Sequence, residues 1–407
     1  MGSSLLFLML PESPYPPRCG NALRDVQQVK LLQQMGFMVR LLLMQRRSDL
    51  KEPELDFVPS GVEVAYASSL AERRESLARL LWRKTGYLLW SRKHAFAWWT
   101  VAARPAEFLA AEVARRKPFA VLMRSTFIDS IAALRGSYDG PVIVDSHDAD
   151  VHLAVEAVRS VPLWRRLGPF ANLRAIRRAC QAYLPLADEI WAVSAEDAER
   201  IRAQAAVKRV VVVPSGVDVP NLGEAGESAG VSAVMVANYG YGPNANGLRW
   251  LIEKVWPSVL QALPTACLEL VGGNMPAELE KKCRSTPGCT IYGRVENLEL
   301  FYRRAAVVVA PLWEGGGTRL KIVEAWGHGK AVLTTTKGIE GLSAPENCAV
   351  VADSPVLFAH ALVMLFQDPA MRLRLGTNGR NFVRDQLSYS SVLEIMESQS
   401  LLTAVCQ

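Results

Sequence analysis

This chain of 407 residues lacks the features of several large protein classes. Its seven cysteines are odd in number and scattered, and no two of them form a CxxC pair. This pattern argues against both a disulfide framework and a zinc site. The apolar runs near the start are far too short to span a bilayer, and no charged segment precedes a cleavable hydrophobic one. We therefore expect a cytoplasmic protein.

Two common ligand-binding motifs are also missing. No GxGxxG follows the first apolar run, where Pro11–Pro17 stands instead, and this disfavours a dinucleotide oxidoreductase. No DxD-type acidic pair stands at a strand end in the second half of the chain. We therefore expect no bound metal ion, and the sequence indicates no cofactor.

The apolar pattern that is present predicts two α/β domains. With 50% hydrophobic and 21% charged residues, the chain has a globular composition and exceeds the size of a usual single core. Short apolar runs alternate with helical stretches, as in βαβ units of a parallel sheet. The predicted strands are Leu5–Leu10, Val39–Met44, Ala120–Met123, Val142–Val144, Glu189–Val193 and Val210–Val213, then Val234–Ala237, Cys267–Val271, Thr290–Tyr292, Val307–Ala310 and Ala331–Thr334.

A break in this alternation marks the boundary between the domains. Pro214-Ser215-Gly216 and the Gly/Ala/Ser-rich stretch Val219–Gly230 interrupt the series. We predict one domain over 1–215 and a second over 216–385, with the C-terminal helix 386–407 packing back on the first. Open α/β sheets bind ligands at the carboxyl ends of their strands, so we expect the active site between the two domains.

One segment in the second domain indicates a phosphate site. The apolar run Ala305–Ala310 is followed by Gly315, Gly316 and Gly317 and then by a predicted helix that carries Arg319, Lys321 and Glu324. Glycines let backbone N–H groups approach an anion, and a helix N-terminus adds its positive dipole end. Arg319 and Lys321 supply positive charge, while a carboxylate such as Glu324 accepts hydrogen bonds from sugar hydroxyls.

The segment Pro311–Leu342 resembles the nucleotide-binding motif of retaining glycosyltransferases of family 4 (group 1), in a variant that reads GGGTRLK. The resemblance extends over most of the chain and implies the GT-B fold, which has two Rossmann-like domains facing across a cleft. It implies an acceptor domain at the N-terminus and a donor domain at the C-terminus. The donor-binding residues it implies are Gly20, Gly293, Arg294, Gly315, Gly316, Gly317, Thr318, Leu320 and Glu324.

The resemblance also implies catalytic residues, namely His147, Glu314, Arg319 and Lys321. His147 follows an apolar strand in Val144-Asp145-Ser146-His147-Asp148, which is similar to the histidine motif of the family. Many members have a glutamate where this chain has Gly316. Either the loop bulges so that Glu314 reaches the donor sugar, or the amides of Gly316 and Gly317 take over its contacts.

Charge is distributed unevenly along the chain. Residues 1–215 carry 30 Lys and Arg against 22 Asp and Glu, whereas 216–407 carry 16 against 18. Within 71–104, eight basic and two acidic side chains alternate with six large aromatic ones. This pattern fits either of two faces. One binds an anionic membrane surface, which would place the protein at the inner face of the plasma membrane, and the other is a solvated face over core tryptophans. No nucleic-acid-binding module accompanies the charge, so we expect no nucleic-acid partner.

The expected activity is retaining, metal-independent transfer of a sugar from a UDP- or GDP-sugar to a hydroxyl of a glycan, lipid-linked or small-molecule acceptor. The resemblance implies a hexosyltransferase type of enzyme acting in polysaccharide biosynthesis. Two alternatives stay open. A sugar-nucleotide epimerase shares the GT-B architecture, and the missing glutamate fits a non-catalytic subunit that binds nucleotide sugars.

Overall fold

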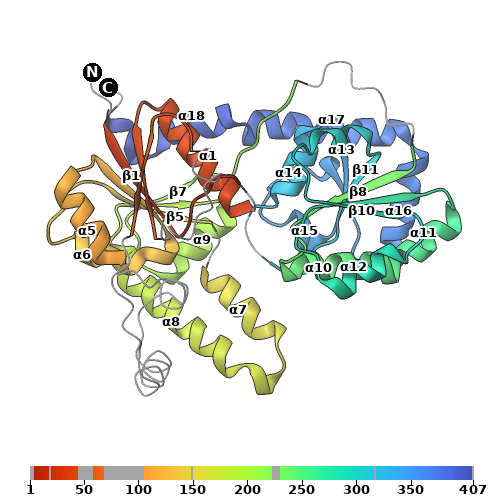
Figure 1. The fold of residues 1–407 in the computed structure, drawn as a ribbon, viewed down its shortest axis with the longest axis horizontal. Coiled ribbons are helices and arrows are strands. Elements are labelled where there is room, and N and C mark those ends of the chain that lie inside the picture. The colour runs from red at the N-terminus through yellow and green to blue at the C-terminus, as the bar shows by residue number, and fades with distance from the viewer. Residues whose placement is uncertain are drawn as a thin grey trace. The chain divides into compact units, whose positions relative to one another are not determined.

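The computed structural model describes residues 4–17, 20–44, 58–67, 105–147, 150–221, 230–315 and 318–405. The chain forms two compact units, Met1–Pro214 with Leu393–Gln407 and Ser215–Val392. Each unit is a fully parallel sheet covered by helices on both faces (Figure 1). The predicted α/β fold class, two doubly wound parallel domains, is confirmed.

The sheet of the first unit has seven strands. Their spatial order is β3 (Val62–Tyr66), β2 (Met38–Leu43), β1 (Leu5–Leu10), β4 (Ala120–Arg124), β5 (Val142–Ser146), β6 (Glu189–Ala192) and β7 (Val210–Val212). The chain moves from β1 to β2 on one side and returns to β4 on the other, so the order reverses between β1 and β4. Ligands of such sheets bind beyond the carboxyl ends of the strands at this point.

Helices cover both faces of this first sheet. The core on one face draws buried side chains from α5 (Pro105–Arg116), η2 (Ser125–Ser130), α6 (Ile131–Leu134), α7 (Asp150–Ser160), α8 (Leu167–Tyr183) and α9 (Ala195–Gln204). Short 3-10 turns, η3 (Leu163–Arg165) and η4 (Leu184–Leu186), flank α8. No residue of α1 (Gly20–Gln34) belongs to this core, and α1 covers the other face (Figure 1).

The sheet of the second unit has six strands. Their spatial order is β10 (Cys289–Gly293), β9 (Cys267–Val271), β8 (Ser232–Val236), β11 (Val307–Ala310), β12 (Ala331–Thr334) and β13 (Ala349–Val351). Here the order reverses between β8 and β11. The predicted strands Cys267–Val271, Val307–Ala310 and Ala331–Thr334 have the bounds that the sequence indicated.

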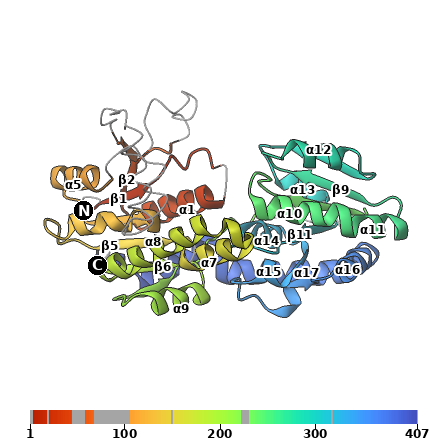
Figure 2. The same ribbon diagram turned by 90° about the horizontal axis from the view of Figure 1, so that it is seen from below.

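Helices lie on both sides of the sheet of the second unit (Figures 1 and 2). Each face of the sheet has its own core of buried side chains. One core contains side chains of α10 (Gly242–Trp250), the π-helix η5 (Leu251–Val255), α11 (Trp256–Ala262), α12 (Ala277–Arg284) and α16 (Pro355–Gln367). The other contains side chains of α13 (Glu299–Arg304), α14 (Leu320–Gly327) and the π-helix η7 (Val383–Leu387). α17 (Pro369–Phe382) adds Leu375 to the first of these cores, and η6 (Glu346–Cys348) adds Cys348 to the second. The short helix α15 (Thr336–Ile339) follows β12.

The C-terminal segment is α18 (Tyr389–Gln399) followed by η8 (Leu401–Val405). It is held to the first unit by the buried carboxylate of Glu189 on β6. Ser400 Oγ donates to Glu189 Oε1 at 2.6 Å, and the backbone N–H of Leu401 donates to Oε2 at 2.9 Å. Among the described residues no single helix is long and apolar enough to cross a membrane. Only a pair bent by 101°, Pro355–Gln367 with Pro369–Leu387, has the required length and composition.

Candidate active site

Two helices of the second unit begin at the point where its strand order reverses. α10 follows β8 and α14 follows β11. Neither helix has a side-chain cap at its N-terminus, and neither has an acidic residue in its first turn. By contrast, Ser354 caps α16, and Asp368 caps α17. Uncapped N–H groups and an uncompensated dipole favour an anion at the start of α10 and α14.

Lys321 lies in the first turn of α14 and points to α10. Its Nζ donates a hydrogen bond to Asn244 Oδ1, and Asn244 Nδ2 donates in turn to the carbonyl of Asn238 at 2.8 Å. The pKa of Lys321 is lowered to about 7, mainly by burial and also by the charge of Arg319, while the charge of Glu324 opposes this shift. An ammonium group of this kind gains from an anionic ligand, which would restore its charged form.

Glu324 lies one turn further along α14. Ile322, Val323, Ala325 and Trp326 around it are fully buried, so the helix offers this carboxylate few polar partners. Tyr302 Oη donates to Glu324 Oε2 at 3.3 Å. Burial raises the pKa of Glu324 to about 7, against the opposing hydrogen bond from Tyr302 and charge of Lys321. The side chain therefore retains acceptor capacity for hydroxyl groups.

Arg319 is the residue that precedes α14, and it fastens the loop between β11 and that helix. Its Nη2 donates to the carbonyl of Gly315 at 2.7 Å and to that of Lys337 at 3.4 Å. Gly315 has φ +97°, which favours glycine, and a Cβ there would lie 3.0 Å from Tyr241 Oη. Gly316 and Gly317 lie outside the described residues.

The other predicted residues of this loop lie beside Arg319. Glu314 Oε1 accepts a hydrogen bond from Asn246 Nδ2 at 2.7 Å, which ties the loop to α10. The carbonyl of Thr318 accepts from the backbone N–H of Leu320 at 2.8 Å, and Leu320 packs against the adjacent core.

The neighbouring strands β9 and β10 also end in glycines. Gly272 after β9 has φ +131°, and a Cβ there would lie 1.8 Å from the carbonyl oxygen of Ala237. Gly293 ends β10 with φ +69°, and its carbonyl accepts from the N–H of Gly272 at 2.7 Å. The exposed Arg294 follows. The glycines thus let the backbone segments that follow the adjacent strands β8, β9 and β10 approach one another closely at this edge of the sheet.

In the first unit, His147 follows β5 at the carboxyl edge of the other sheet. Its Nε2 lies 2.6 Å from Asp145 Oδ2 and 3.4 Å from Asp25 Oδ1. Arg24 Nη2 donates to Asp145 Oδ1 at 2.6 Å, and Arg124 Nη2 donates to Asp25 Oδ2 at 2.6 Å. The result is a compact cluster of two arginines, two aspartates and one histidine, where the strand order reverses between β1 and β4.

The two aspartates of this cluster differ in acidity. Burial alone would raise the pKa of Asp145, but the Arg24 and His147 charges and hydrogen bonds hold it well below its usual range. Burial raises the pKa of Asp25, with the charges of Arg124 and His147 opposing and that of Asp145 adding. Asp145 is therefore the stronger anchor for His147. Gly20, predicted to bind the donor, is the exposed first residue of α1, which carries Arg24 and Asp25.

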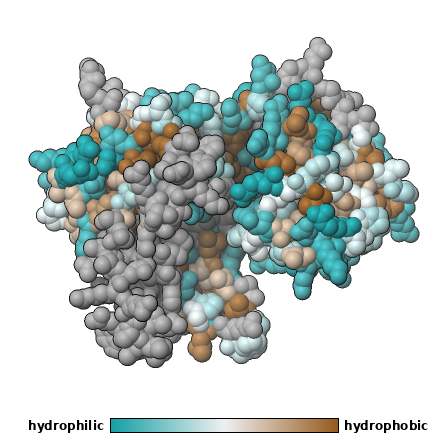
Figure 3. Space-filling view, in the orientation of Figure 1, coloured by the Kyte–Doolittle hydropathy of each residue, from teal (hydrophilic) through white to brown (hydrophobic). Residues whose placement is uncertain are grey.

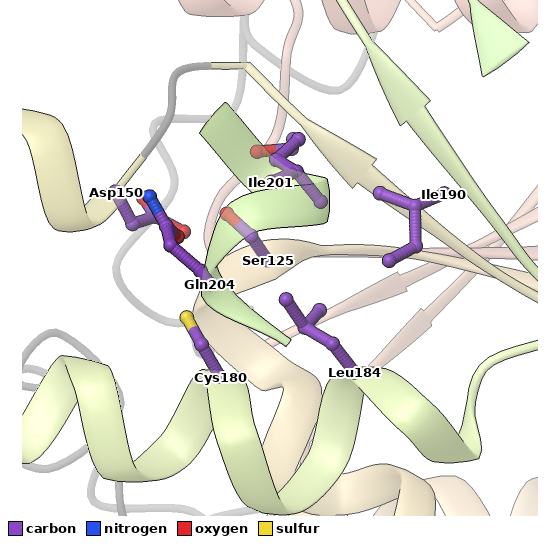
Figure 4. Close-up of a pocket in the computed structure, with 8 residues that line it drawn as sticks. Ser125, Asp150, Cys180, Leu184, Ile190, Ile201 and Gln204 are labelled. Carbon is purple, nitrogen blue, oxygen red and sulfur yellow. The ribbon is translucent and has the colours of Figure 1, made fainter. Parts of the chain in front are cut away.

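A small pocket of the first unit is lined by residues that include Ser146 at the end of β5 (Figure 4). Asp150 and Gln204 gather at one end of it, and Leu184 and Ile190 lie at the other. Its volume of about 10 Å³ is room for one water. His152, the other histidine near this edge, lies on α7 with Nε2 3.3 Å from Glu156 Oε1. In the part of the chain that the structure describes, no three His, Cys, Asp or Glu side chains are grouped so as to hold a metal ion.

The structure thus gathers Glu314, Gly315, Thr318, Arg319, Leu320, Lys321 and Glu324 around one loop and helix. Reasoning from the sequence missed Asn244 and Tyr302, the partners of Lys321 and Glu324. It also missed Arg24 and Asp25 as companions of His147. The only sequence signal for these residues was a polar side chain near the end of a strand or in the first turns of a helix. Many solvent-exposed residues have the same placement, so this signal did not identify the site residues.

A comparison with protein families supports the class of this fold and site. Residues 230–368 match the family described as Glycosyl transferases group 1. This range contains α10, α14 and the loop between β11 and α14. The match lies within the second unit, and the fold of the chain is GT-B. Together they support a glycosyltransferase.

Two solved structures and one further protein are similar to this chain. The structure of sucrose-phosphate synthase (tll1590) from Thermosynechococcus elongatus is similar at a TM-score of 0.73 and 16% identity, over 98% of this chain and 100% of that one. Anabaena Alr3699/HepE in complex with UDP and glucose is similar at 0.66 and 13%, over 98% and 100%. The "Uncharacterized 44.6 kDa protein in cps region" of Klebsiella pneumoniae is 24% identical over 169 residues. That match covers 40% of this chain and 44% of the relative.

Proposed function

We propose that this protein is a glycosyltransferase of hexosyltransferase type that moves a sugar from a nucleotide diphosphate sugar to a hydroxyl group of an acceptor. The observation that carries the proposal is the convergence of Lys321, Arg319 and Glu324 at the uncapped start of α14. A diphosphate and a ribose are the two chemical groups that such a cluster would bind side by side. The second unit is thus the donor domain, and the first is the acceptor domain.

The donor would bind through its diphosphate and its ribose. Lys321 would turn its ammonium group from Asn244 to a phosphate oxygen, and the N–H groups at the start of α14 would donate to the same phosphates. Arg319 would contribute positive charge and keep the glycine loop in place through Gly315. Glu324 would accept hydrogen bonds from the ribose hydroxyls. Gly293 and Arg294 would lie beside the base.

Catalysis would depend on fixed positive charge. As the nucleotide diphosphate leaves the anomeric carbon, negative charge grows on the phosphate oxygens, and Arg319, Lys321 and backbone N–H groups would stabilise it. We propose that these groups make a metal ion unnecessary. We also propose retention of configuration, with the acceptor hydroxyl attacking from the face that the diphosphate leaves. His147 would position or polarise the donor sugar or the acceptor, and Glu314 would contact the donor sugar.

The relatives support particular classes of donor and acceptor. Anabaena HepE binds UDP and glucose, which favours a UDP-sugar here, with a GDP-sugar as the other candidate. The Klebsiella pneumoniae relative comes from a cps region, which favours a glycan or lipid-linked acceptor in polysaccharide biosynthesis. The basic, aromatic segment 71–104, outside the described residues, keeps its predicted role as a face that binds anionic membranes.

The experiment that tests this function follows labelled donors in the presence and absence of acceptor. Incubation with UDP- and GDP-sugars and a panel of lipid-linked and glycan acceptors should release nucleotide diphosphate at a rate that depends on the acceptor. Conversion of the donor sugar without any acceptor would instead show an epimerase. Binding without turnover of any donor would show a binding subunit.

A further inference from the structure

The hairpin formed by α7 and α8 extends away from the sheet of the first unit (Figure 1). The two helices pack along one another, and residues 161–166, which include η3, connect them. The later part of α8 is anchored in the core, since Leu173, Ile176 and Cys180 are at most 6% exposed. The connected ends of the two helices are the part of the hairpin that lies outside that core.

This outer end carries large apolar side chains on its surface. Leu163 is 78%, Trp164 73%, Leu167 79% and Phe170 56% exposed. The structure describes five exposed large hydrophobic side chains in the first unit, and four of them lie here. They therefore form a cluster, whereas exposed hydrophobic residues are usually scattered singly. Figure 3 shows hydrophobic residues at the end of this hairpin, next to hydrophilic ones.

The same hairpin carries basic side chains without acidic neighbours in sequence. Residues 157–187 contain six arginines and no Asp or Glu. Arg159, Arg174 and Arg177 are exposed. The acidic residues of the hairpin, Asp150 and Glu156, lie on α7 before this stretch. An apolar end and a basic flank are therefore combined on one protruding element.

We propose that the outer end of the hairpin, Leu163–Phe170, docks on an anionic lipid bilayer. Leucine and phenylalanine side chains would enter the boundary between headgroups and acyl chains, and Trp164 is of the type that favours the headgroup level. The arginines on the flank would meet the anionic headgroups. A nucleic acid would match the arginines but would gain little from four exposed apolar side chains, so the lipid surface fits the two features together. This surface is separate from 71–104, and its role does not depend on the reaction proposed above.

The test is co-sedimentation of the full chain with vesicles of phosphatidylcholine alone and with 30% phosphatidylglycerol. The triple variant Leu163→Ser, Leu167→Ser, Phe170→Ser should lower partition onto the anionic vesicles about tenfold or more, because it removes the apolar contact. The variant Arg174→Gln, Arg177→Gln should lower it about 25-fold, since each basic residue near such a surface contributes a factor of about five. Binding of the parent should also weaken at high salt.

Matched controls come from the second unit. Leu357 and Leu373 are each 60% exposed, so Leu357→Ser with Leu373→Ser repeats the two leucine changes on the surface of the other unit. Lys254 and Arg374 are exposed and serve as the charge control when both are changed to Gln. Both control variants should bind vesicles like the parent, and all variants should keep its thermal unfolding midpoint.

A fluorescence experiment places the hairpin at the bilayer directly. The blue shift of tryptophan emission on anionic vesicles should be smaller in Trp164→Phe, while partition stays close to that of the parent. The proposal is overturned if the hairpin variants partition like the parent, as they would if 71–104 alone bound the vesicles. It is equally overturned if the parent binds neither kind of vesicle.

Discussion

His147 Nε2 lies 2.6 Å from Asp145 Oδ2, and the same carboxylate receives the guanidinium of Arg24. One buried anion therefore fixes both a histidine at the end of β5 and an arginine on α1. Since Nε2 is the nitrogen that meets the carboxylate, Nδ1 is the nitrogen that a sugar hydroxyl would meet in the proposed function. Asp145 is thus a positioning residue for His147.

Asp145→Asn should destabilise the protein by about 3–5 kcal/mol at pH 7, because it leaves Arg24 buried without its anion. The effect should depend on pH in a defined direction. The pKa of Asp145 is lowered on folding, so its stabilisation is present above the unfolded pKa of about 3.9 and is lost as pH falls below it.

Denaturant unfolding of parent and variant at pH 7 and pH 3 measures this difference. The difference in the free energy of unfolding between parent and variant should be smaller at pH 3 than at pH 7 by about 1 kcal/mol. The exposed Asp139, changed to Asn, serves as the control and should have little effect at either pH. An Asp145→Asn variant as stable as the parent at pH 7 would contradict the anchoring role.

The affinity for a diphosphate should depend on the protonation of Lys321. Burial lowers the pKa of this side chain to about 7, so its charged form is lost as pH rises through neutrality. Binding of inorganic pyrophosphate, followed by calorimetry, should therefore weaken between pH 6 and pH 8.5 more in the parent than in Lys321→Gln. The comparison cancels the titration of pyrophosphate itself. Parallel pH profiles for parent and variant would count against Lys321 as a phosphate ligand.

Glu324→Gln should reduce donor affinity and leave the fold intact, because it keeps the shape and one acceptor oxygen and removes the charge. If Glu324 accepts hydrogen bonds from ribose hydroxyls, the parent should prefer UDP over deoxy-UDP, and this preference should shrink in the variant. Competition binding of the two nucleotides measures it. A variant that discriminates as well as the parent would refute the role.

Gly247 on α10 should be needed for the geometry of the loop after β11. A Cβ at this position would lie 1.9 Å from the carbonyl oxygen of Pro311, whereas a Cβ at Gly242 on the same helix would meet nothing within 4 Å. Gly247→Ala should therefore cost about 1–3 kcal/mol of stability and weaken nucleotide diphosphate binding. Gly242→Ala should do neither. Equal behaviour of the two variants in thermal unfolding and calorimetry would show that the loop adapts freely.

The sequence predicted the central strands of both sheets but not two of their edges. β3 and β13 were missed, and both are edge strands that are only partly buried. Central strands of a parallel sheet are covered on both faces and are continuously apolar, whereas an edge strand such as Val62–Tyr66 includes polar residues. Continuous apolar runs therefore identify the middle of the sheet more reliably than its borders.

The candidate site was predictable where charge and glycine cluster in sequence, and not where partners come from elsewhere in the chain. Lys321 and Glu324 stand in one motif, but Asn244 precedes Lys321 by 77 residues. Arg24 precedes Asp145 by 121 residues. Such pairs meet only because parallel strands bring the starts of their helices to one edge of the sheet. Which residues pair in this way depends on the three-dimensional fold, and local sequence patterns do not predict the pairs.

The most direct test of the donor site is calorimetric titration of UDP and GDP into the parent, Lys321→Met and the control Lys254→Met. Methionine keeps the aliphatic length of lysine, and Lys254 is an exposed lysine of the same unit. Loss of a charged hydrogen bond should lower the affinity of Lys321→Met for the preferred diphosphate by about 1.5–3 kcal/mol, or about 10- to 150-fold, and leave nucleoside binding unchanged. The control should bind like the parent. Unchanged diphosphate affinity in Lys321→Met would contradict the account.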